Sequence, residues 1–289
     1  MDIKGTMQFE IGNTAFDCNR TVIMGVLNVT PDSFYDGGKY FDRKRAVEHV
    51  LEMVEEGADI IDIGGESSRP GAEPVLEEDE LKRVIPVIEA VASRISVPIS
   101  IDTYRANVAK QAIEAGAGII NDISALRFDP QMIDVVRNND VSIIFMHMLG
   151  NPQSMQVDPR YVNVVEDILG FLKERVAFAV AKGIPQARII VDPGIGFGKT
   201  LEHNLEIIRN CDRFHETGCP VLIGVSHKSM IGKITGSPVE ERLWGTAAIT
   251  AYCVINGIEI HRVHDVKAMR QVCDVAAAIC SCSSVSLGS

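Results

Sequence analysis

Short apolar runs alternate with longer amphipathic segments along most of the chain. The runs show no regular alternation of apolar and polar positions, which is typical of strands buried on both faces of a parallel sheet. Eight such runs are present, at residues 21–27, 59–63, 97–101, 118–120, 141–146, 188–192, 220–225 and 258–263. The pattern therefore predicts eight parallel strands.

The segments between the runs have apolar residues at three- and four-residue spacing, which predicts helices. Clear examples are residues 43–57, 77–94 and 105–116, and several of these segments end at glycine. Eight strands and eight helices in 289 residues favour an α/β fold of the (β/α)8 or TIM barrel type. The alternative is an open doubly wound sheet, which usually has fewer strands.

The predicted barrel domain covers residues 21–278. Residues 1–20 read as a hairpin that turns at Gly12-Asn13 and closes the bottom of the barrel, and residues 279–289 read as a flexible tail. Two connections, 28–42 and 64–79, are long and rich in Gly, Pro and Ser. Such loops are typical of mobile active-site lids, although an inert surface loop can have the same composition.

Composition limits the classes of function. No run of eighteen apolar residues occurs and the first residues form no apolar block, so we expect neither a membrane span nor a secretory signal, and a cytoplasmic location. The seven cysteines lack paired CxxC spacing and are expected to be reduced and mostly buried. A net charge of −11 disfavours binding to nucleic acid or anionic lipid. Any anionic ligand therefore needs a local cluster of positive charge.

Polar residues stand at the carboxyl end of almost every predicted strand. In a barrel of this type these strand ends surround one mouth, where the chemistry takes place. Asn28, Asp62, Asp102, Asn121, His147, Asp192, Ser226, Lys228, Arg262 and His264 occupy these positions. So many hydrogen-bonding groups indicate a polar, ring-shaped ligand together with an anion.

A first subset provides acceptors, an amide and one cationic donor, namely Asp102, Asn121, Asp192 and Lys228. This combination suits the edge of a nitrogen-rich heterocycle that carries both amino and carbonyl groups. Two alternatives stay open: Asp102 caps the next helix, and Asp192 serves only the turn before Gly194.

A second subset, Ser68, Arg69, Arg262 and His264, provides the donors that phosphate oxygens accept. The alternative for Lys228 and Arg262 is a solvated charge at the rim. His147 is expected to be a structural histidine. The sequence has no carboxylate–histidine cluster with metal spacing, so we expect no tightly bound transition metal.

The stretch "DPGIGFGK" at residues 192–199 looks like the glycine-rich turn of a nucleotide-binding protein. A dinucleotide fingerprint follows the first strand of a βαβ unit, whereas this stretch follows the sixth predicted strand. We therefore expect the glycines to let the backbone pass close to a flat ligand beside Asp192, with Phe197 covering it.

Several motifs together resemble the dihydropteroate synthase family of folate biosynthesis. They include "MGVLNVTPDSFYDGGKY", "DIGGESSRPGAEPV", "VDPGIGFGK", "LIGVSHKSMIG" and "HRVHDV", in the same order and spacing, from about residue 20 to 277. The resemblance implies a transferase that joins 4-aminobenzoate to (7,8-dihydropterin-6-yl)methyl diphosphate and releases pyrophosphate. It also implies Mg²⁺, inhibition by sulfonamides, a dissociative displacement and a homodimer formed through helices near the C-terminal end.

The resemblance also assigns roles to individual residues. Those expected to bind the pterin are Asp102, Asn121, Met146, Asp192, Phe197, Gly224 and Lys228. Those expected at the diphosphate are Asn28, which also contacts the metal, with Ser68, Arg69, Arg262 and His264. The aminobenzoate pocket is expected to use Thr30, Pro31, Asp32, Ser33, Phe34, Asp36, Arg69, Pro70 and Ser229. The catalytic set is Asp102, Asn121, Asp192, Lys228, Arg262 and His264.

The sequence departs from the family pattern at two positions. Ser68 replaces a common threonine and keeps the hydroxyl, whereas His227 replaces a common arginine and loses a permanent charge. The second change puts the affinity for the aminobenzoate carboxylate and its sulfonamide mimics in question. Two alternative functions remain, a pterin-dependent methyltransferase and a non-catalytic pterin-binding paralogue.

Overall fold

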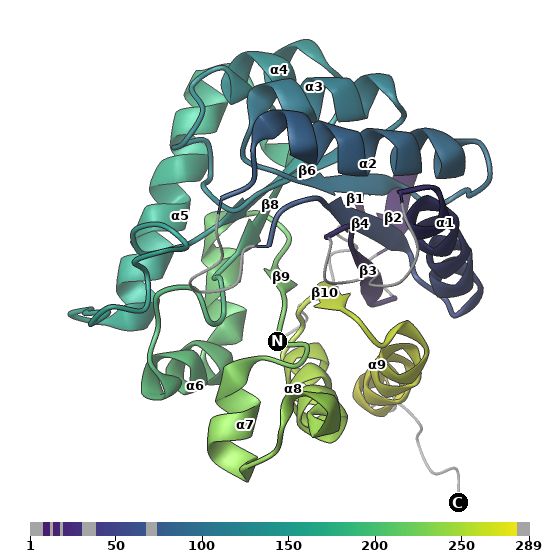
Figure 1. The fold of residues 1–289 in the computed structure, drawn as a ribbon. Coiled ribbons are helices and arrows are strands. Elements are labelled where there is room, and N and C mark those ends of the chain that lie inside the picture. Colours follow the sequence, from purple (N-terminus) through teal and green to yellow (C-terminus); the bar gives the residue numbers. More distant parts are fainter. Residues whose placement is uncertain (1–7, 12–13, 18–19, 31–38, 68–73, 282–289) are drawn as a thin grey trace, which may run out of the picture.

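Eight parallel strands form a barrel surrounded by helices in the computed structural model (Figure 1). The structure describes residues 8–11, 14–17, 20–30, 39–67 and 74–281. Every predicted strand is present, which confirms the TIM barrel. The strands are β3 (Val22–Asn28), β4 (Ile60–Gly64), β5 (Ile99–Asp102), β6 (Ile119–Asp122), β7 (Ser142–Met146), β8 (Ile189–Asp192), β9 (Leu222–Ile223) and β10 (Ile260–Val263).

The ring closes on itself, although not equally well at every junction. Parallel pairing runs in the order β8-β7-β6-β5-β4-β3-β10-β9. Only an isolated bridge between Val191 and Val221 joins β8 to β9, supported by a hydrogen bond of 2.9 Å from the Val191 N–H to the Pro220 carbonyl. This last contact excludes the alternative of an open doubly wound sheet.

The helices correct three details of the predictions. Nine α-helices occur in the described residues instead of eight, because α7 and α8 both lie between β9 and β10. The first long connection ends earlier than predicted, since α1 begins at Lys39, and α9 continues to Ser281, into the predicted flexible tail. The helices are α1 (Lys39–Glu55), α2 (Glu77–Ala92), α3 (Ala106–Glu114), α4 (Met132–Asn138), α5 (Val164–Ala181), α6 (Leu201–Arg209), α7 (Ser229–Thr235), α8 (Leu243–Ile255) and α9 (Val266–Ser281).

Shorter elements complete the description. Three 3₁₀ turns occur in the described part of the chain, η2 (Gln186–Arg188), η3 (Cys211–Thr217) and η4 (Val239–Glu241). The amino-terminal hairpin consists of β1 (Gln8–Ile11) and β2 (Thr14–Asp17), and the turn expected at Gly12-Asn13 lies outside the described residues. β1 contacts η2, which leads into β8, and closure of the barrel bottom by residues 1–20 stays a prediction.

Strand periodicity connects the inside of the barrel to its mouth. One apolar cluster fills the interior: Val22, Met24, Ile60, Ile119, Ile144, Ile190, Leu222 and Ile260. Successive side chains of a strand point to opposite faces, so the residue two positions further along each strand also points inward, nearer the carboxyl end. Asp62, Asn121, Asp192 and Arg262 stand at those positions. The apolar interior therefore forms the floor of a polar site.

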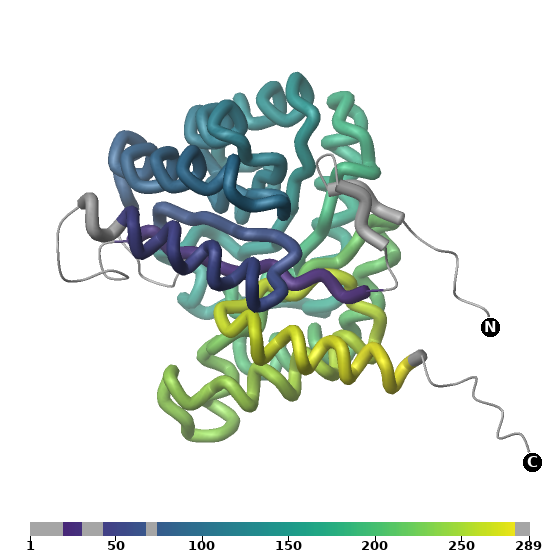
Figure 2. Tube along the Cα trace, turned by 90° about the vertical axis from the view of Figure 1, so that its right-hand side faces the viewer, coloured from purple at the N-terminus to yellow at the C-terminus, as the bar shows by residue number. Residues whose placement is uncertain are grey.

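A second, larger core lies between the barrel and the helices and includes the buried rings of Phe145 and Phe214. Figure 2 shows α9 beside β3, so the last helix covers the first barrel strand. There Arg270 donates from Nη1 to the Thr21 carbonyl over 2.9 Å and to Asp59 Oδ2 over 3.1 Å. None of the described helices combines the length and apolarity needed to cross a membrane.

The described cysteines agree with the sequence prediction. Cys211, Cys219, Cys253 and Cys273 are buried thiols, and Cys280 is an exposed one. None of these five forms a disulfide, so a disulfide framework does not hold this part of the fold together.

Candidate active site

Three polar side chains lie in one row across adjacent strands. The strand register pairs Asn28 with Gly64, Gly64 with Asp102, and Asp102 with Asn121. Gly64 leaves space within this row, because a Cβ atom there would lie 3.3 Å from Cβ of Asp102. The register thus brings Asn28, Asp102 and Asn121 to the same level of the mouth.

Arg262 connects the two subsets that the sequence analysis treated separately. Its Nε donates to Asp62 Oδ2 over 2.7 Å, and its Nη2 donates to Asp102 Oδ2 over 2.9 Å. Asp62 Oδ2 also accepts from Asn121 Nδ2 over 3.2 Å. Asp62 is fully buried, and the sequence analysis gave it no role in either subset. Its position two residues after Ile60 could have revealed it.

Asp102 lies at the mouth and does not cap α3. The cap residue of that helix is Arg105, which makes no side-chain cap hydrogen bond. Burial raises the pKa of Asp102 to about 7; the Arg262 guanidinium acts in the opposite direction, and the neighbouring Asp62 raises it further. Near neutral pH the carboxyl can therefore exist in either protonation state.

Asp192 serves the turn before Gly194 and also stands at the mouth, so the two roles considered from the sequence do not exclude each other. Its Oδ1 accepts the Gly194 N–H over 2.7 Å, which fixes the turn. Burial raises its pKa to about 6, an effect opposed by the Gly194 N–H and by Lys228. Gly194 has φ +69, and a Cβ there would lie 2.0 Å from the His147 carbonyl oxygen. Close backbone packing therefore accounts for this glycine without a nucleotide.

An apolar cluster, here called the slot, lies beside the polar groups of the mouth, where Met146 pairs with Asp192 in the strand register. Lys228 Nζ lies 4.3 Å from the centroid of the Phe197 ring. Gly196 makes room for this stacking, since a Cβ there would lie 3.3 Å from Lys228 Cδ. The apolar residues of the slot are Ile123, Met146, Met148 and Met155, with Tyr104 and Phe197 packed against them. Ile123, Met148 and Met155 were missed from the sequence, because apolar loop residues carry no specific signal.

His147 is structural, as expected, and it accompanies a buried lysine that the sequence analysis missed. Lys199 Nζ lies 3.0 Å from His147 Nδ1 and donates to the Phe197 carbonyl over 2.9 Å. Burial lowers the pKa of Lys199 to about 7, partly opposed by Asp192. Burial and the charge of Lys199 lower the pKa of His147 to about 2. Lys199 therefore holds the loop backbone that presents Phe197.

His264 lies on the side of the mouth where the sequence predicts that an anion binds. Its Nδ1 lies 2.9 Å from Ser226 Oγ, and burial together with Arg262 lowers its pKa to about 4. His264 is consequently neutral at physiological pH. Gly224 lies beside Arg262, with the position of a Cβ 3.6 Å from Cβ of the arginine.

Two of the remaining predicted site residues lie within the described residues, and the others lie outside them. Ser229 is exposed at the start of α7, next to Lys228, and Thr30 is half-buried two residues beyond the end of β3. Eight others lie outside the described residues: Pro31, Asp32, Ser33, Phe34, Asp36, Ser68, Arg69 and Pro70.

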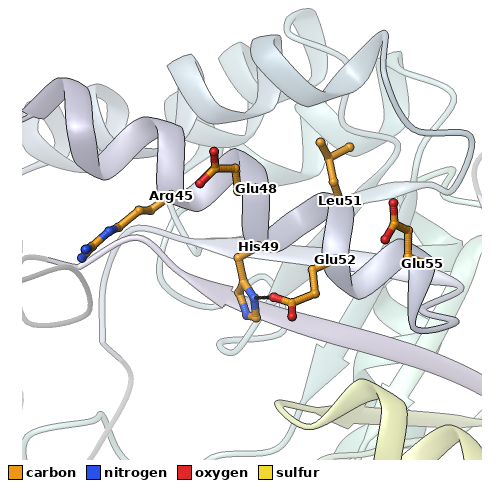
Figure 3. A pocket seen from close by; sticks show the side chains of 6 residues that line it. All are labelled: Arg45, Glu48, His49, Leu51, Glu52 and Glu55. Carbon is orange, nitrogen blue, oxygen red and sulfur yellow. Dashed lines mark hydrogen bonds and ion pairs between the residues drawn. The ribbon is translucent and has the colours of Figure 1, made fainter.

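Two hollows differ in their relation to this site. One of about 270 Å³ adjoins the mouth and is lined by Gln156, Gly196, Lys199, Leu201, Asn204, Lys228, Ser229, Met230 and Lys233. The other, about 540 Å³, lies on the outer surface of α1 (Figure 3). It is open and formed by the six helix residues labelled in the figure, of which His49 and Glu52 are 3.3 Å apart. We assign the function to the mouth, where the buried charges converge.

The described residues contain no group of three His, Cys, Asp or Glu side chains placed to hold a metal ion. Asn28, half-buried at the end of β3, offers one amide oxygen at the mouth. Magnesium commonly takes one or two protein ligands and completes its shell with water and phosphate oxygens. The site therefore fits a magnesium ion that arrives with a phosphorylated ligand.

A model of the family "Pterin binding enzyme" matches residues 24–264. A dihydropteroate synthase from Clostridium beijerinckii is 49% identical over 263 residues, covering 91% of this chain and 93% of the relative. The chain belongs to the dihydropteroate synthase family. This membership confirms the resemblance of the motifs, and the polar mouth is the part of the barrel that the family motifs surround.

Solved structures of the family have the same fold. A Yersinia pestis dihydropteroate synthase with a sulfonamide drug is 39% identical, with a TM-score of 0.90, covering 95% of this chain and all of that one. A Xanthomonas albilineans dihydropteroate synthase with 4-aminobenzoic acid is 41% identical, with a TM-score of 0.88, covering 94% of this chain and 97% of that one.

Proposed function

We propose that this enzyme joins 4-aminobenzoate to (7,8-dihydropterin-6-yl)methyl diphosphate, forming 7,8-dihydropteroate and pyrophosphate. One observation carries the assignment: Arg262 bonds to Asp102 among the pterin-type acceptors and lies beside His264 on the anion side. A single ligand with a heterocycle and a phosphate group would satisfy both sides. Family membership supports the same reaction.

The polar groups of the mouth would recognise the pterin by its hydrogen-bonding edge. Asp102 and Asp192, when ionised, accept N–H donors from the ring, and Lys228 donates to its carbonyl oxygen. Asn121 uses its N–H₂ group on Asp62, so its amide oxygen remains to accept from the ligand. Met146 and Phe197 would contact the ring faces.

The mouth would then stabilise the leaving group. In a dissociative displacement the C–O bond breaks first and its electron pair leaves with the diphosphate, while the pterin ring stabilises the methylene cation. Arg262 and the neutral His264 would hydrogen-bond the departing oxygens, and one well-placed donor contributes roughly 3 kcal/mol. The arylamine nitrogen then forms the C–N bond and loses a proton. Since 4-aminobenzoate is weakly basic, no strong general base is required.

Asn28 would hold Mg²⁺ beside the diphosphate, where the ion would neutralise the charge of the phosphate oxygens. The apolar side chains of the slot would exclude water, which otherwise competes with the arylamine for the cation. A sulfonamide would compete with 4-aminobenzoate in the same place; the Yersinia pestis protein was solved as a complex with a sulfonamide drug.

A homodimer and a cytoplasmic location belong to the same proposal. Exposed apolar side chains collect on α8 and α9, and Trp244 is 80% exposed. Tyr252 and Ile255 on α8, with Val275 and Ile279 on α9, continue this surface at helical spacing. An apolar surface of this kind favours contact with a second copy.

The decisive experiment measures pyrophosphate release from the pterin diphosphate with and without 4-aminobenzoate, and identifies dihydropteroate by chromatography. We expect release that depends on the arylamine and Mg²⁺ and equals the product formed. Pterin binding without release would indicate the non-catalytic paralogue. Methyl transfer without pyrophosphate would indicate the methyltransferase.

A further inference from the structure

His227 has an unusual backbone conformation for its residue type. It lies in the turn between β9 and α7 with φ +53, in the left-handed region. This conformation costs a residue with a Cβ roughly 1–2 kcal/mol, so the surrounding contacts have to maintain it. Strained backbone conformations of this kind are concentrated at functional sites.

Two side chains at the start of α8 hold the backbone of His227. The His227 N–H donates to Thr246 Oγ1 over 3.1 Å, and its carbonyl accepts from Arg242 Nη1 over 3.0 Å. Arg242 precedes α8 and Thr246 lies in its first turn. The turn is therefore fixed against a helix outside the barrel mouth.

The His227 ring lies between two acceptors. Nδ1 is 2.9 Å from the Val239 carbonyl oxygen, and Nε2 is 2.6 Å from Asp265 Oδ2. Both partners are acceptors, so these two contacts fix the orientation of the ring.

The residues on either side of His227 both belong to the mouth. Ser226 Oγ contacts His264 Nδ1 and accepts the His264 backbone N–H over 3.2 Å. Lys228 stacks on Phe197. Because both nitrogens of the His227 ring are already bonded, the ring has no donor left for a ligand.

We propose that His227 is a positioning residue: its ring, held by Asp265 and Val239, fixes the turn so that Ser226 and Lys228 face the mouth. The two ring centroids of His227 and His264 are 5.8 Å apart, and His227 lowers the pKa of His264 further, after burial and Arg262. The other charged groups facing this pair are Arg242, which bonds to the His227 carbonyl, and Lys228 and Arg262 beside His264. The inference rests on the proposed function. It assigns His227 no contact with the aminobenzoate carboxylate.

The test compares two arylamines in His227→Asn. Asparagine tolerates the left-handed conformation but lacks the ring contacts. At saturating pterin diphosphate we measure kcat/KM for 4-aminobenzoate and for the uncharged 4-aminobenzamide, each relative to the wild type. We expect both to fall by a similar factor of about 10, the effect of one lost charge-assisted hydrogen bond. A loss confined to 4-aminobenzoate would indicate a carboxylate contact and overturn the proposal, as would unchanged kinetics.

A second measurement does not depend on turnover. NMR titration of the His264 ring should show a higher pKa in His227→Asn, because the neighbouring His227 ring lowers the pKa of His264 in the wild type. An unchanged His264 titration contradicts the proposal even if the kinetics fall. If the wild type releases no pyrophosphate with either arylamine, the proposed function fails, and this titration still decides the role of His227.

His215 provides a matched control. Its ring also lies between a carbonyl and a carboxylate, with Nδ1 2.9 Å from the Asp212 oxygen and Nε2 3.0 Å from Glu259. Glu259 precedes β10, at the end of the barrel opposite the mouth. His215→Asn should lower thermal stability and leave kcat/KM for both arylamines unchanged. If His227→Asn unfolds at the assay temperature, Asp265→Asn replaces it in the kinetic comparison, where kcat/KM for both arylamines should again fall by a similar factor.

Discussion

Asp62 and Arg262 form an ion pair of 2.7 Å between residues 200 positions apart in the sequence. The same Asp62 oxygen accepts from Asn121, so one buried carboxylate holds two side chains of the site. Because the pair joins β4 to β10, it depends on the closed barrel and also orients the groups at the mouth.

Asp62→Asn should lower both stability and pterin binding. Breaking a buried ion pair leaves a charge without its partner and costs about 3–5 kcal/mol. In this variant Arg262 still has Asp102 as an ion-pair partner, so the loss should be smaller. We expect a decrease of about 2 kcal/mol in the free energy of unfolding, measured with urea. Asp59→Asn, at the other end of the same barrel, removes a partner of Arg270 and should lower stability without changing pterin affinity. Equal pterin affinities in the two variants would contradict this role.

Asp102→Asn should separate stability from function. Because the pKa of Asp102 is about 7 in the fold and ~3.9 in an unfolded chain, the folded state binds this proton more tightly. The resulting stabilisation is complete below the unfolded value and is lost as the pH rises through 7. Asparagine at position 102 cannot ionise, so the Tm of the variant should exceed that of the wild type at pH 8. Each kcal/mol of stabilisation that the wild type loses by ionisation should correspond to roughly 3 °C in Tm, and the difference should be much smaller at pH 5.

Pterin affinity should meanwhile fall in Asp102→Asn, because an amide is a weaker acceptor than a carboxylate. Binding by the wild type should weaken as the pH falls below 7. The control is Asp134→Asn on the surface of α4, whose Tm should differ from that of the wild type by the same amount at both pH values. A Tm difference that does not vary with pH would contradict the assignment to Asp102.

Two glycine substitutions should have opposite effects. Gly194→Ala places a methyl group against the His147 carbonyl in a left-handed conformation, and should cost roughly 3 kcal/mol or more. Gly170 lies inside α5, where an added methyl group would meet no neighbouring side chain within 4 Å, so Gly170→Ala should add up to ~1 kcal/mol. Chemical denaturation measures both values. A mild effect at Gly194 would show that the turn can shift.

Trp244→Glu should produce a monomer if the apolar surface of α8 and α9 joins two copies. Sedimentation velocity at micromolar concentration gives the oligomeric state. Val162 is also fully exposed but precedes α5, so Val162→Glu serves as the control and should leave the assembly unchanged. A monomeric wild type would remove the homodimer from the proposal.

The sequence predicted the barrel and much of its mouth because repeated strand–helix units place all strand ends on one side. Asp102, Asn121, Asp192, Lys228 and Arg262 follow from that rule. Their interactions with one another did not follow, because uninterrupted apolar runs do not reveal strand register. Register is what places Gly64 between Asn28 and Asp102.

Three other features of the structure had too weak a signal in the sequence to be predicted. The sequence predicted eight helices for eight strands, so the short α7, which precedes α8 between β9 and β10, was not expected as a separate helix. His227 takes a conformation usually marked by glycine, and only its contacts with Arg242, Thr246, Val239 and Asp265 explain it. The small residues near the end of α9 resembled a tail, although the helix continues to Ser281.

The single bridge between β8 and β9 makes their junction the least connected part of the ring. Asp192 ends one of these strands and Lys228 follows the other, so a molecule bound to both spans the gap between them. A bound ligand then stabilises the junction between β8 and β9. The Tm and the protection of backbone amides from hydrogen exchange at this junction should rise together as the bicyclic substrate saturates the site.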